Sequence, residues 1–268
     1  MLASATALAY HTHMKLTVLG SGTTVPHPTR TSSGYWLETS SGTLLLDCSA
    51  GVQFRIAAKG LDWANVDAIW ISHFHLDHVG GLAPYLQSLK VAPECKSREA
   101  PLRIFGPVGL QAWFDRMNAV NDYRLLEQPF PIGIFEQASV EPFFVLPGVE
   151  ALAVKTPHTD ESQALFIRDS NGEKVVYSSD TGPTEILATL GNNADLFILE
   201  CSYFRDKGTD KHLELAEAMH IIRKAHPKRA MLTHFYAEWD GVNFDEEVAR
   251  FDPPCEVVEA VDGLVINV

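Results

Sequence analysis

The densest group of side chains that could carry chemistry lies at residues 71–78, which read ISHFHLDH. Residues two apart in an extended segment point to the same side, so His73, His75 and Asp77 are expected to converge. A helix is expected to start next and to turn His78 toward a neighbouring point. Imidazole and carboxylate groups bind zinc, manganese or iron. Two such ligand sets side by side would suit two cations about 3.5–4 Å apart, the geometry of two-metal hydrolysis.

Three further residues stand where apolar, strand-like runs end. His158 follows LAVKTP, Asp180 ends VVYSSD and His234 ends AMLTH. Taken singly, each has a plainer interpretation: His158 as a loop histidine, Asp180 as a turn residue, and His234 as an interior histidine. Open α/β sheets, however, build their sites at the carboxyl ends of strands. Their shared position therefore favours one common site.

These motifs carry a family resemblance that spans residues 15–268. HFHLDH resembles the H-x-H-x-D-H signature of the metallo-β-lactamase superfamily, and the later residues follow in that family's order. The resemblance implies an α/β fold, a four-layer αββα sandwich of two mixed sheets flanked by helices. It assigns His73, His75, His158 and Asp180 to one metal, and Asp77, His78, Asp180 and His234 to the other. The implied cofactors are two divalent metal ions, zinc in first place, with manganese and iron as alternatives.

Other motifs are similar to the ribonuclease Z-like phosphodiesterase branch of that superfamily. They are LGSGTTVPHPTR, SDTGP and KHLELAEA. The branch places a histidine that is not a ligand at His212, where it contacts the phosphate or assists the leaving group; a solvated histidine opening a helix is the alternative. The resemblance also implies that Asp47, at the end of TLLLD, braces the metal loop. Asp77 and His212 are thus the residues expected to take part in catalysis.

The expected activity is that of a metal-dependent hydrolase. A hydroxide bridging the two metal ions would attack a small or cyclic phosphodiester. One alternative is tRNA 3′ processing, as by ribonuclease Z, and another is lactone or thioester hydrolysis on the same dinuclear site. Enzymes that process tRNA typically carry a basic arm between the third metal histidine and the bridging aspartate. The interval from His158 to Asp180 is only long enough for a hairpin.

Composition limits the partners of the chain. It has 21 Lys and Arg against 34 Asp and Glu, a net charge of -13 and a pI near 5.2. A broad basic surface for nucleic acid is therefore not expected, although an extended nucleic acid stays open as an alternative. Two bound dications would still attract a small anionic substrate to the site. No apolar run approaches the roughly 20 residues that span a bilayer, so no membrane partner is expected.

The 4 cysteines lie far apart without a C-x-x-C pair, which favours reduced thiols in the cytoplasm. Cys201 is expected to be a buried structural cysteine and not a nucleophile. Residues 1–13 are predicted to form a loose extension before a single domain at 14–268. The segment 121–150 reads as irregular, with four prolines among four phenylalanines. It could form a lid, a homodimer contact or a long connection.

Short strands and helices are expected to alternate along the rest of the chain. Strands are predicted at 15–20, 35–39, 43–47, 67–72, 102–105, 151–156, 163–169, 174–179, 195–200, 229–233, 255–260 and 264–268. Helices are predicted at 51–59, 79–90, 109–121, 183–190, 212–225 and 243–251.

Overall fold

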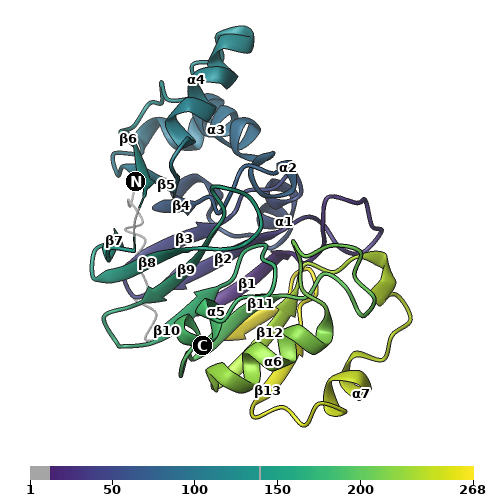
Figure 1. Ribbon diagram of the computed structural model, residues 1–268. Coiled ribbons are helices and arrows are strands. Elements are labelled where there is room, and N and C mark those ends of the chain that lie inside the picture. The colour runs from purple at the N-terminus through teal and green to yellow at the C-terminus, as the bar shows by residue number, and fades with distance from the viewer. Residues whose placement is uncertain (1–12, 139) are drawn as a thin grey trace.

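Two mixed sheets of seven strands each form the centre of the protein (Figure 1). The structure, a computed structural model, describes residues 13–138 and 140–268. The first sheet runs in the order β14 (Val265–Asn267), β1 (Lys15–Gly20), β2 (Gly34–Thr39), β3 (Gly42–Leu46), β4 (Ala68–Trp70), β5 (Leu102–Pro107) and β6 (Ile132–Gln137). The second runs in the order β13 (Glu256–Glu259), β12 (Arg229–Thr233), β11 (Leu196–Glu200), β10 (Lys174–Tyr177), β9 (Gln163–Arg168), β8 (Val149–Lys155) and β7 (Phe143–Leu146).

Helices flank the two sheets. They are α1 (Val52–Ala58), α2 (Leu76–Val79), α3 (Leu82–Val91), α4 (Leu110–Asn121), α5 (Ile186–Leu190), α6 (Leu215–Ala225) and α7 (Phe244–Ala249). Short 3₁₀ turns lie at Trp63–Asn65, Pro93–Ser97 and Ala237–Trp239. Figure 1 shows α3 and α4 over the first sheet, with α5 and α6 over the second. The predicted four-layer αββα sandwich is confirmed.

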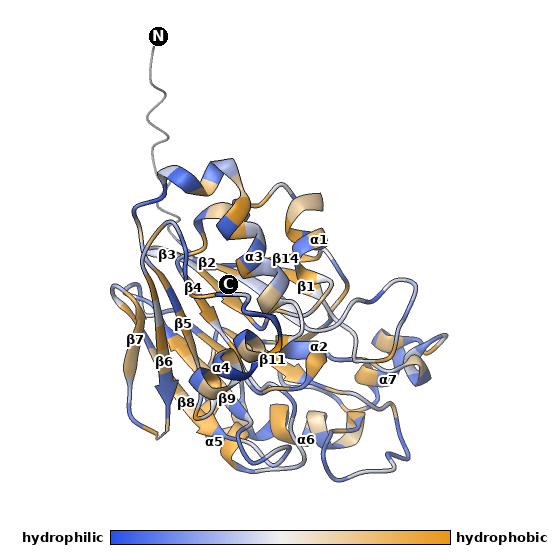
Figure 2. Ribbon diagram, turned by 90° about the horizontal axis from the view of Figure 1, so that it is seen from above, coloured by the Kyte–Doolittle hydropathy of each residue, from blue (hydrophilic) through white to orange (hydrophobic). Residues whose placement is uncertain are grey.

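Alternation along the strands explains how two cores form. Leu44 and Leu46 belong to the core that both sheets share, whereas Leu45 between them belongs to the core under α1, α3 and α4. Successive strand residues point to opposite faces, so one strand supplies both cores. Figure 2 shows hydrophobic residues concentrated along the strands, while helices such as α6 carry both colours.

Strand direction decides where polar groups gather. In the first sheet β3, β4, β5 and β6 are parallel neighbours, and in the second β10, β11, β12 and β13 are. Neighbouring parallel strands end at the same edge of their sheet. Asp47 follows β3, Asp180 lies just beyond β10, Glu200 ends β11 and His234 follows β12. The loops at these strand ends therefore carry the candidate site.

The prediction that 121–150 is irregular is wrong. β6 and β7 lie within it, as the edge strands of the first and second sheets. Pro131 and Pro142 directly precede the two strands, where a missing N–H breaks no ladder. Stacked rings hold these edges together, because Phe105 stacks on Phe135 at 4.9 Å and on Phe143 at 5.4 Å between ring centroids.

The helix predicted at 212–225 begins later than expected. α6 starts at Leu215, and a capping box between Glu214 and Glu217 fixes its first turn, so His212 lies in the preceding loop and does not open the helix. The predicted extension at 1–13 lies outside the described residues except for His13. Within the part of the chain that the structure describes, no helix is both long enough and apolar enough to cross a bilayer.

Candidate metal centre

The HFHLDH segment leaves β4 as an extended loop and then turns into α2. His75 has extended backbone angles (φ -65°, ψ 144°) and is the residue before the helix. Because α2 begins at Leu76, Asp77 and His78 lie in a helical turn. The expectation that Asp77 shares one side of an extended segment with His73 and His75 is therefore wrong. The helical turn instead directs Asp77 and His78 to a second group of side chains.

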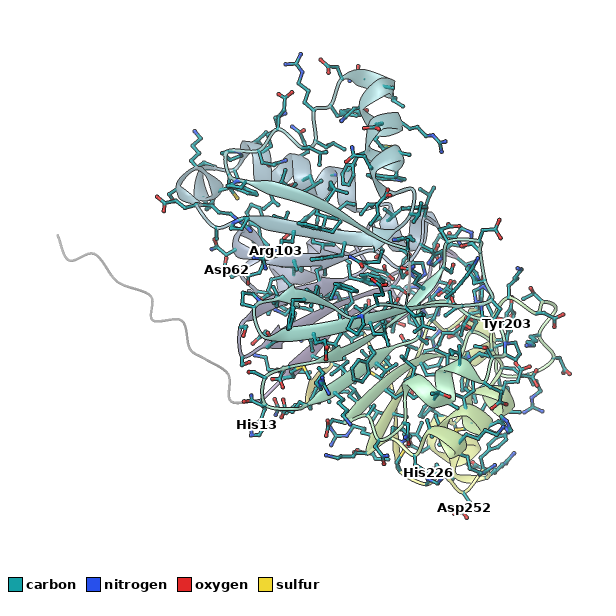
Figure 3. The ribbon with its side chains drawn as sticks, turned by 60° about the vertical axis from the view of Figure 1, so that its left-hand side comes forward. His13, Asp62, Arg103, Tyr203, His226 and Asp252 are labelled. Carbon is teal, nitrogen blue, oxygen red and sulfur yellow. The ribbon has the colours of Figure 1, made fainter. Side chains whose placement is uncertain are left out.

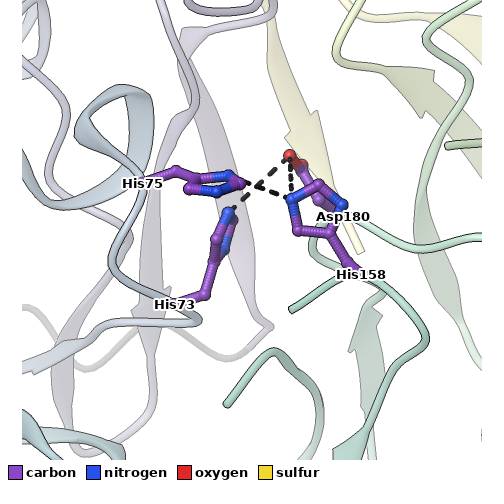
Figure 4. Close-up of side chains that lie close together, drawn as sticks. All are labelled: His73, His75, His158 and Asp180. Atoms are coloured by element: carbon purple, nitrogen blue, oxygen red, sulfur yellow. Dashed lines mark hydrogen bonds and ion pairs between the residues drawn. The ribbon is translucent and has the colours of Figure 1, made fainter. Parts of the chain in front are cut away.

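The first group brings together His73, His75, His158 and Asp180 (Figure 4). One nitrogen or oxygen of each lies within 4.8 Å of the others. The nearest pair is His158 Nε2 and His75 Nδ1, which are 3.0 Å apart. Asp180 Oδ2 lies 3.8 Å from His73 Nε2 and 3.7 Å from His158 Nε2. His75 is the solvent-exposed member of this group, and the other three are buried.

The second group consists of Asp77, His78, Asp180 and His234, and its polar atoms also lie within 4.8 Å of one another. Asp180 Oδ1 is 3.2 Å from His78 Nε2 and 3.3 Å from His234 Nε2. Asp77 Oδ2 lies 3.5 Å from His234 Nε2. The two carboxylate oxygens of Asp180 thus face different groups: Oδ2 the first, and Oδ1 the second.

The two groups meet at the Asp180 carboxylate, and we call this place the junction. Four buried polar atoms at the junction have no hydrogen-bond partner. They are Nε2 of His73, His78 and His234, and Oδ2 of Asp180. A buried polar group without a partner costs free energy, and a buried carboxylate costs more. Divalent cations in the two groups would accept lone pairs from these atoms, and imidazole with carboxylate is a donor set that transition metals bind. The groups therefore fit bound divalent metal.

Asp47 braces the second group from behind. It follows β3 and is fully buried. Its Oδ2 accepts hydrogen bonds from His78 Nδ1 at 2.7 Å, the Ser72 hydroxyl at 2.8 Å and the Tyr177 hydroxyl at 2.6 Å. Its Oδ1 accepts one from the Ser72 backbone N–H at 2.7 Å. A carboxylate on Nδ1 makes that nitrogen the donor, which leaves Nε2 of His78 as the lone pair facing Asp180.

Three other imidazoles are also oriented by a contact at Nδ1. His158 Nδ1 donates to the Lys211 carbonyl at 2.9 Å, and because a carbonyl only accepts, Nε2 of His158 carries the lone pair that faces His75 and Asp180. His73 Nδ1 lies 3.0 Å from the Ser72 hydroxyl, and His234 Nδ1 lies 2.9 Å from the Ser202 hydroxyl. These contacts fix the ring orientations of the site.

His212 lies against the two metal-candidate histidines that the second sheet supplies. Its ring centroid is 4.8 Å from that of His158 and 5.4 Å from that of His234. Its Nδ1 donates to Glu200 Oε1 at 2.9 Å. Burial lowers the pKa of His212, but the hydrogen bond and charge of Glu200 outweigh burial and raise that pKa above its ordinary value. His212 is therefore suited to hold a proton beside the two groups.

Glu200 is a candidate functional residue that the sequence interpretation missed. It is 1% exposed and accepts hydrogen bonds from the backbone N–H groups of Thr181 (2.7 Å), Ser202 (3.2 Å) and Leu213 (3.2 Å). The signal was present, because Glu200 closes the apolar run LFILE as Asp47 closes TLLLD. Glu200, His212 and His234 also form a third cluster of polar atoms. Hydrogen bonds satisfy both oxygens of the Glu200 carboxylate, so this carboxylate needs no metal as a partner.

Backbone conformation at the strand ends is unusual. Asp47, Ser179 and His234 have φ of 57°, 55° and 64°. Side chains other than glycine seldom occupy this left-handed region, and such residues collect at functional sites. All three lie just past β3, β10 and β12. The turn re-aims each side chain from the strand toward the junction.

Burial and neighbouring charges shift the pKa values of the side chains in the two groups. Burial lowers the pKa of His73 well below its ordinary value, with the nearby His78 adding to the effect. Burial also acts to lower the pKa of His78, but the charges of Asp180 and Asp47 raise it well above the usual range. Burial acts to raise the pKa of Asp180, and the charges of His234 and His78 hold it well below its usual value. Asp180 and Asp47 therefore favour a proton on His78 when no cation is present, and a bound cation would displace that proton from Nε2.

The remaining sequence candidates lie outside the two groups. Cys201 is fully buried and unpaired, which agrees with a structural thiol. The loop that begins GSGTTV borders the site, because Gly22 bridges Phe235, the residue after His234. The histidines left unassigned by sequence lie elsewhere: His13 contacts Glu173, His27 contacts Asp240, His220 contacts Glu185, His226 is at the periphery (Figure 3), and His11 is outside the described residues.

Comparison with known proteins places this geometry in a class. The metallo-β-lactamase fold protein YhfI from Bacillus subtilis is similar over 96% of this chain and 100% of its own, with a TM-score of 0.82 and 26% identity. Together with the His/Asp groups, this defines a metal-dependent hydrolase of the metallo-β-lactamase superfamily, as predicted. The family model described as Anti-Pycsar protein Apyc1 matches residues 14–252, and the chain belongs to that family.

Ribonuclease Z sequences are also similar over nearly the whole chain. That of Ignicoccus hospitalis is 26% identical over 301 residues, which cover 94% of this chain and 98% of the relative. That of Methanothermobacter thermautotrophicus is 27% identical, covering 94% and 95%. The short form of human tRNase Z shares the fold, with a TM-score of 0.73 and 22% identity over 94% of this chain and 98% of its own. The predicted resemblance to the ribonuclease Z-like branch is confirmed.

Proposed function

We propose that this protein is a phosphodiesterase that hydrolyses a small or cyclic phosphodiester with two divalent cations. The observation that carries the proposal is that the two carboxylate oxygens of Asp180 face different groups. Oδ2 faces His73 and His158, while Oδ1 faces His78 and His234. One carboxylate shared between two ligand sets is the arrangement expected of a two-metal hydrolase. The seven proposed ligands are His73, His75, Asp77, His78, His158, Asp180 and His234.

Zinc is the metal that the donor set suits best, because five of the seven proposed ligands are imidazoles and two are carboxylates. Manganese and iron accept the same donors. When bound, two such cations lower the pKa of a water molecule toward neutrality and neutralise negative charge that develops on the substrate.

The protein's own residues supply the proton transfers. Glu200 accepts from Nδ1 of His212, so Nε2 is the nitrogen that can pass a proton to the leaving oxygen. An alkoxide leaves a phosphodiester far more easily once it is protonated, and positioned acids contribute about 10²–10⁴-fold to such steps. Asp77 is proposed to orient the attacking water by accepting a hydrogen bond from it, in addition to its place among the ligands.

The structure around the site supports a small substrate. The interval between His158 and Asp180 is taken up by β9 and β10, which pair as an antiparallel hairpin joined by residues 169–173. The net charge of -13 disfavours broad contact with a phosphate backbone. Small phosphodiesters need only the charge of the two bound cations to reach the site.

Cleavage of precursor tRNA is the second candidate. The similar proteins named ribonuclease Z and tRNase Z favour it, and the candidate ligands would serve either substrate. Lactone or thioester hydrolysis is a third candidate, because it needs the same cations and the same water. A thioester expels a thiolate, which leaves without protonation, so thioester hydrolysis gives His212 a less clear task than cleavage of either kind of phosphodiester does.

A substrate panel on zinc-loaded protein tests the proposal. It compares methyl p-nitrophenyl phosphate, a cyclic phosphodiester, a precursor tRNA, a lactone and a thioester at equal metal occupancy. We expect multiple turnover on the two small phosphodiesters and slow or no turnover on the others. Multiple turnover on the tRNA alone would replace the proposal with the second candidate, and turnover on the lactone or thioester alone with the third.

We also infer a cytoplasmic homodimer. The four free cysteines, three of them buried, support a reducing compartment. Exposed aromatic side chains at the sheet edge, Phe135 and Phe144, support a contact between copies. Light scattering measures the mass directly, and a mass of one chain at micromolar concentration would contradict the dimer.

A further inference from the structure

The carboxylate of Asp262 lies outside the two ligand groups and accepts hydrogen bonds from three separate segments of the chain. Its side chain is 3% exposed. Oδ1 accepts from the backbone N–H and the hydroxyl of Ser21, both at 2.9 Å. Oδ2 accepts from the backbone N–H of Thr31 at 2.8 Å and from Nη2 of Arg55 at 2.9 Å. Hydrogen bonds to a charged acceptor are among the stronger ones, so Asp262 holds these segments together.

The turn that carries Asp262 is itself bound to the first sheet. This turn joins β13 of the second sheet to β14 of the first. The N–H of Gly263 donates to the Val18 carbonyl at 2.7 Å, and the N–H of Val18 donates to the Leu264 carbonyl at 2.9 Å. Because Val18 belongs to β1, the backbone on the far side of Asp262 is fixed by strand-like pairing. Asp262 is therefore a fixed anchor for the residues that it binds.

Ser21 and Thr31 stand at the two ends of one loop, residues 21–31. The N–H of Gly22 donates to the Thr31 carbonyl at 2.8 Å, so the two ends also bind each other. Asp262 therefore closes the base of the loop. The loop has a second attachment, because His27 and Arg30 both contact Asp240, whose side chain is 49% exposed. Asp262 is the buried attachment of the two.

The base of this loop binds the residue that follows a proposed ligand. The N–H of Phe235 donates to the Ser21 carbonyl at 2.9 Å, and Gly22 pairs with Phe235 in an isolated bridge. His234, the preceding residue, has a φ of 64°. That conformation is costly for a residue other than glycine, and it persists only where the surroundings enforce it. The bond from Phe235 to Ser21 is one of the contacts that enforce it.

We propose that Asp262 is a positioning residue of the metal centre. Through Ser21 and Phe235 it holds the backbone of His234 in the left-handed conformation that aims Nε2 at the second group. The proposal rests on the proposed function, because it takes His234 as a metal ligand. The hydrogen bonds of Asp262 go to residues that are not proposed ligands. Asp262 therefore acts on the metal through the backbone and not by coordination.

Two single-site variants provide the test. His75→Ala leaves the second group complete, and His234→Ala leaves the first group complete. Asp262→Asn exchanges one acceptor oxygen for an NH₂ group, which cannot accept the same hydrogen bonds. We expect Asp262→Asn to weaken zinc binding about tenfold when it is added to His75→Ala, measured by competition with a chromophoric chelator. Added to His234→Ala, it should leave zinc affinity unchanged.

The zinc titrations distinguish failure of this proposal from failure of the proposed function. If neither His75→Ala nor His234→Ala bound zinc, the metal centre would be wrong, and this proposal with it. If both bound zinc and Asp262→Asn lowered the affinity equally in each, Asp262 would act on general stability and not through His234. If Asp262→Asn changed neither affinity, it would have no role in the metal centre. Either of the last two results would overturn this proposal alone.

Ser21→Ala is a milder variant that keeps the test valid if Asp262→Asn does not fold. It removes one buried hydroxyl donor and introduces no new polar group. In the His75→Ala background we expect it to weaken zinc binding in the same direction as Asp262→Asn, by about threefold. In the His234→Ala background it should have no effect. Unchanged zinc affinity in the first background would contradict the proposal.

Amide hydrogen exchange of metal-free protein tests the same connection without zinc. We expect Asp262→Asn to speed exchange in peptides that cover residues 21–31 and 234–236. Asp195→Asn is the matched control, because Asp195 also accepts from a backbone N–H, that of Lys174 at 2.7 Å, but at the opposite end of β10 from the site. The control should leave both peptides unchanged. Exchange at 234–236 that Asp262→Asn does not speed would show that His234 is independent of this anchor.

Discussion

Glu200 Oε1 lies 2.9 Å from His212 Nδ1, and three backbone N–H groups hold the same carboxylate in place. The Ser202 hydroxyl donates to Oε2 of Glu200 at 2.6 Å and also lies 2.9 Å from His234 Nδ1. One carboxylate therefore orients the proposed proton donor and, through a single hydroxyl, a proposed ligand. Glu200 thus supports both the proposed acid, His212, and the proposed metal centre.

Neutralising Glu200 should move the pH dependence of catalysis. Burial alone would lower the pKa of His212, and Glu200 raises it above its ordinary value. In Glu200→Gln the charge is lost, so the pKa of His212 falls and the acid loses its proton at lower pH. We expect the alkaline limb of kcat/KM for methyl phenyl phosphate to shift to lower pH. Glu185→Gln is the control, because Glu185 is an exposed carboxylate that forms an ion pair with Lys224. An alkaline limb that stays in place would exclude His212 as the acid.

Removing His212 should penalise poor leaving groups most. Phenolate needs a proton to leave more than p-nitrophenolate does. We expect His212→Ala to reduce kcat on methyl phenyl phosphate about 10²-fold or more, and on methyl p-nitrophenyl phosphate by less than about tenfold. His220→Ala, on the exposed face of α6, serves as the control. Equal losses on both substrates would show that His212 acts on binding or structure and not on the leaving oxygen.

Metal content should distinguish the shared ligand from an unshared one. Asp180 faces both groups, while His75 belongs to the first alone. We expect Asp180→Asn to lower the occupancy of both metals and His75→Ala to leave about one metal per chain, as measured by plasma mass spectrometry on dialysed protein. His75 is exposed, so its variant should keep the wild-type fold by circular dichroism. Full occupancy in His75→Ala would remove it from the ligand set.

The Tyr177 hydroxyl should matter for stability and for metal binding together. It donates to Asp47 Oδ2 at 2.6 Å, and both side chains are buried. Tyr177→Phe should cost about 1.5–3 kcal/mol of unfolding free energy, because the lost bond is to a charged acceptor. Metal affinity should fall about tenfold, because Asp47 also holds His78. Tyr123→Phe, at 40% exposure, controls for loss of a hydroxyl. Equal unfolding midpoints in urea for the two variants would contradict the bracing role.

Chelation should cost stability as well as activity. Nε2 of His73, His78 and His234 and Oδ2 of Asp180 are buried without hydrogen-bond partners in the protein. We expect a chelator to abolish phosphodiester hydrolysis and to lower Tm, and zinc or manganese to restore both. Metal at 100 times its Kd would stabilise the fold by about 2.7 kcal/mol. A Tm that is indifferent to metal would argue against these atoms as ligands.

Sequence patterns predicted the residues of the site better than its shape. The strand ends that carry His158, Asp180 and His234 were visible as apolar runs that stop at a polar side chain. Strand geometry does not predict that HFHLDH divides between two ligand groups, because the helix begins at Leu76, inside the motif. A run of six residues does not reveal where an extended chain starts to coil.

The missed elements have physical causes too. β6 and β7 are edge strands whose flanking prolines suggested a loop, and their strand conformation depends on rings stacked around Phe105. Glu200 closes the apolar run LFILE, but no motif around it indicates a role. Its importance comes from His212, 12 residues away in the chain, and from hydrogen bonds that only the folded chain creates.

The position of the site across the two sheets has a mechanical consequence. Asp47 and the HFHLDH residues belong to the half of the chain that builds the first sheet, whereas His158, Asp180 and His234 follow strands of the second. Between the sheets the fit depends on contacts such as Trp70 against Phe143, with ring centroids 6.1 Å apart. A slight slide of one sheet over the other would alter ligand spacing before it disturbed either sheet. The packing of the sandwich core thus determines the distance between the two halves of the metal centre.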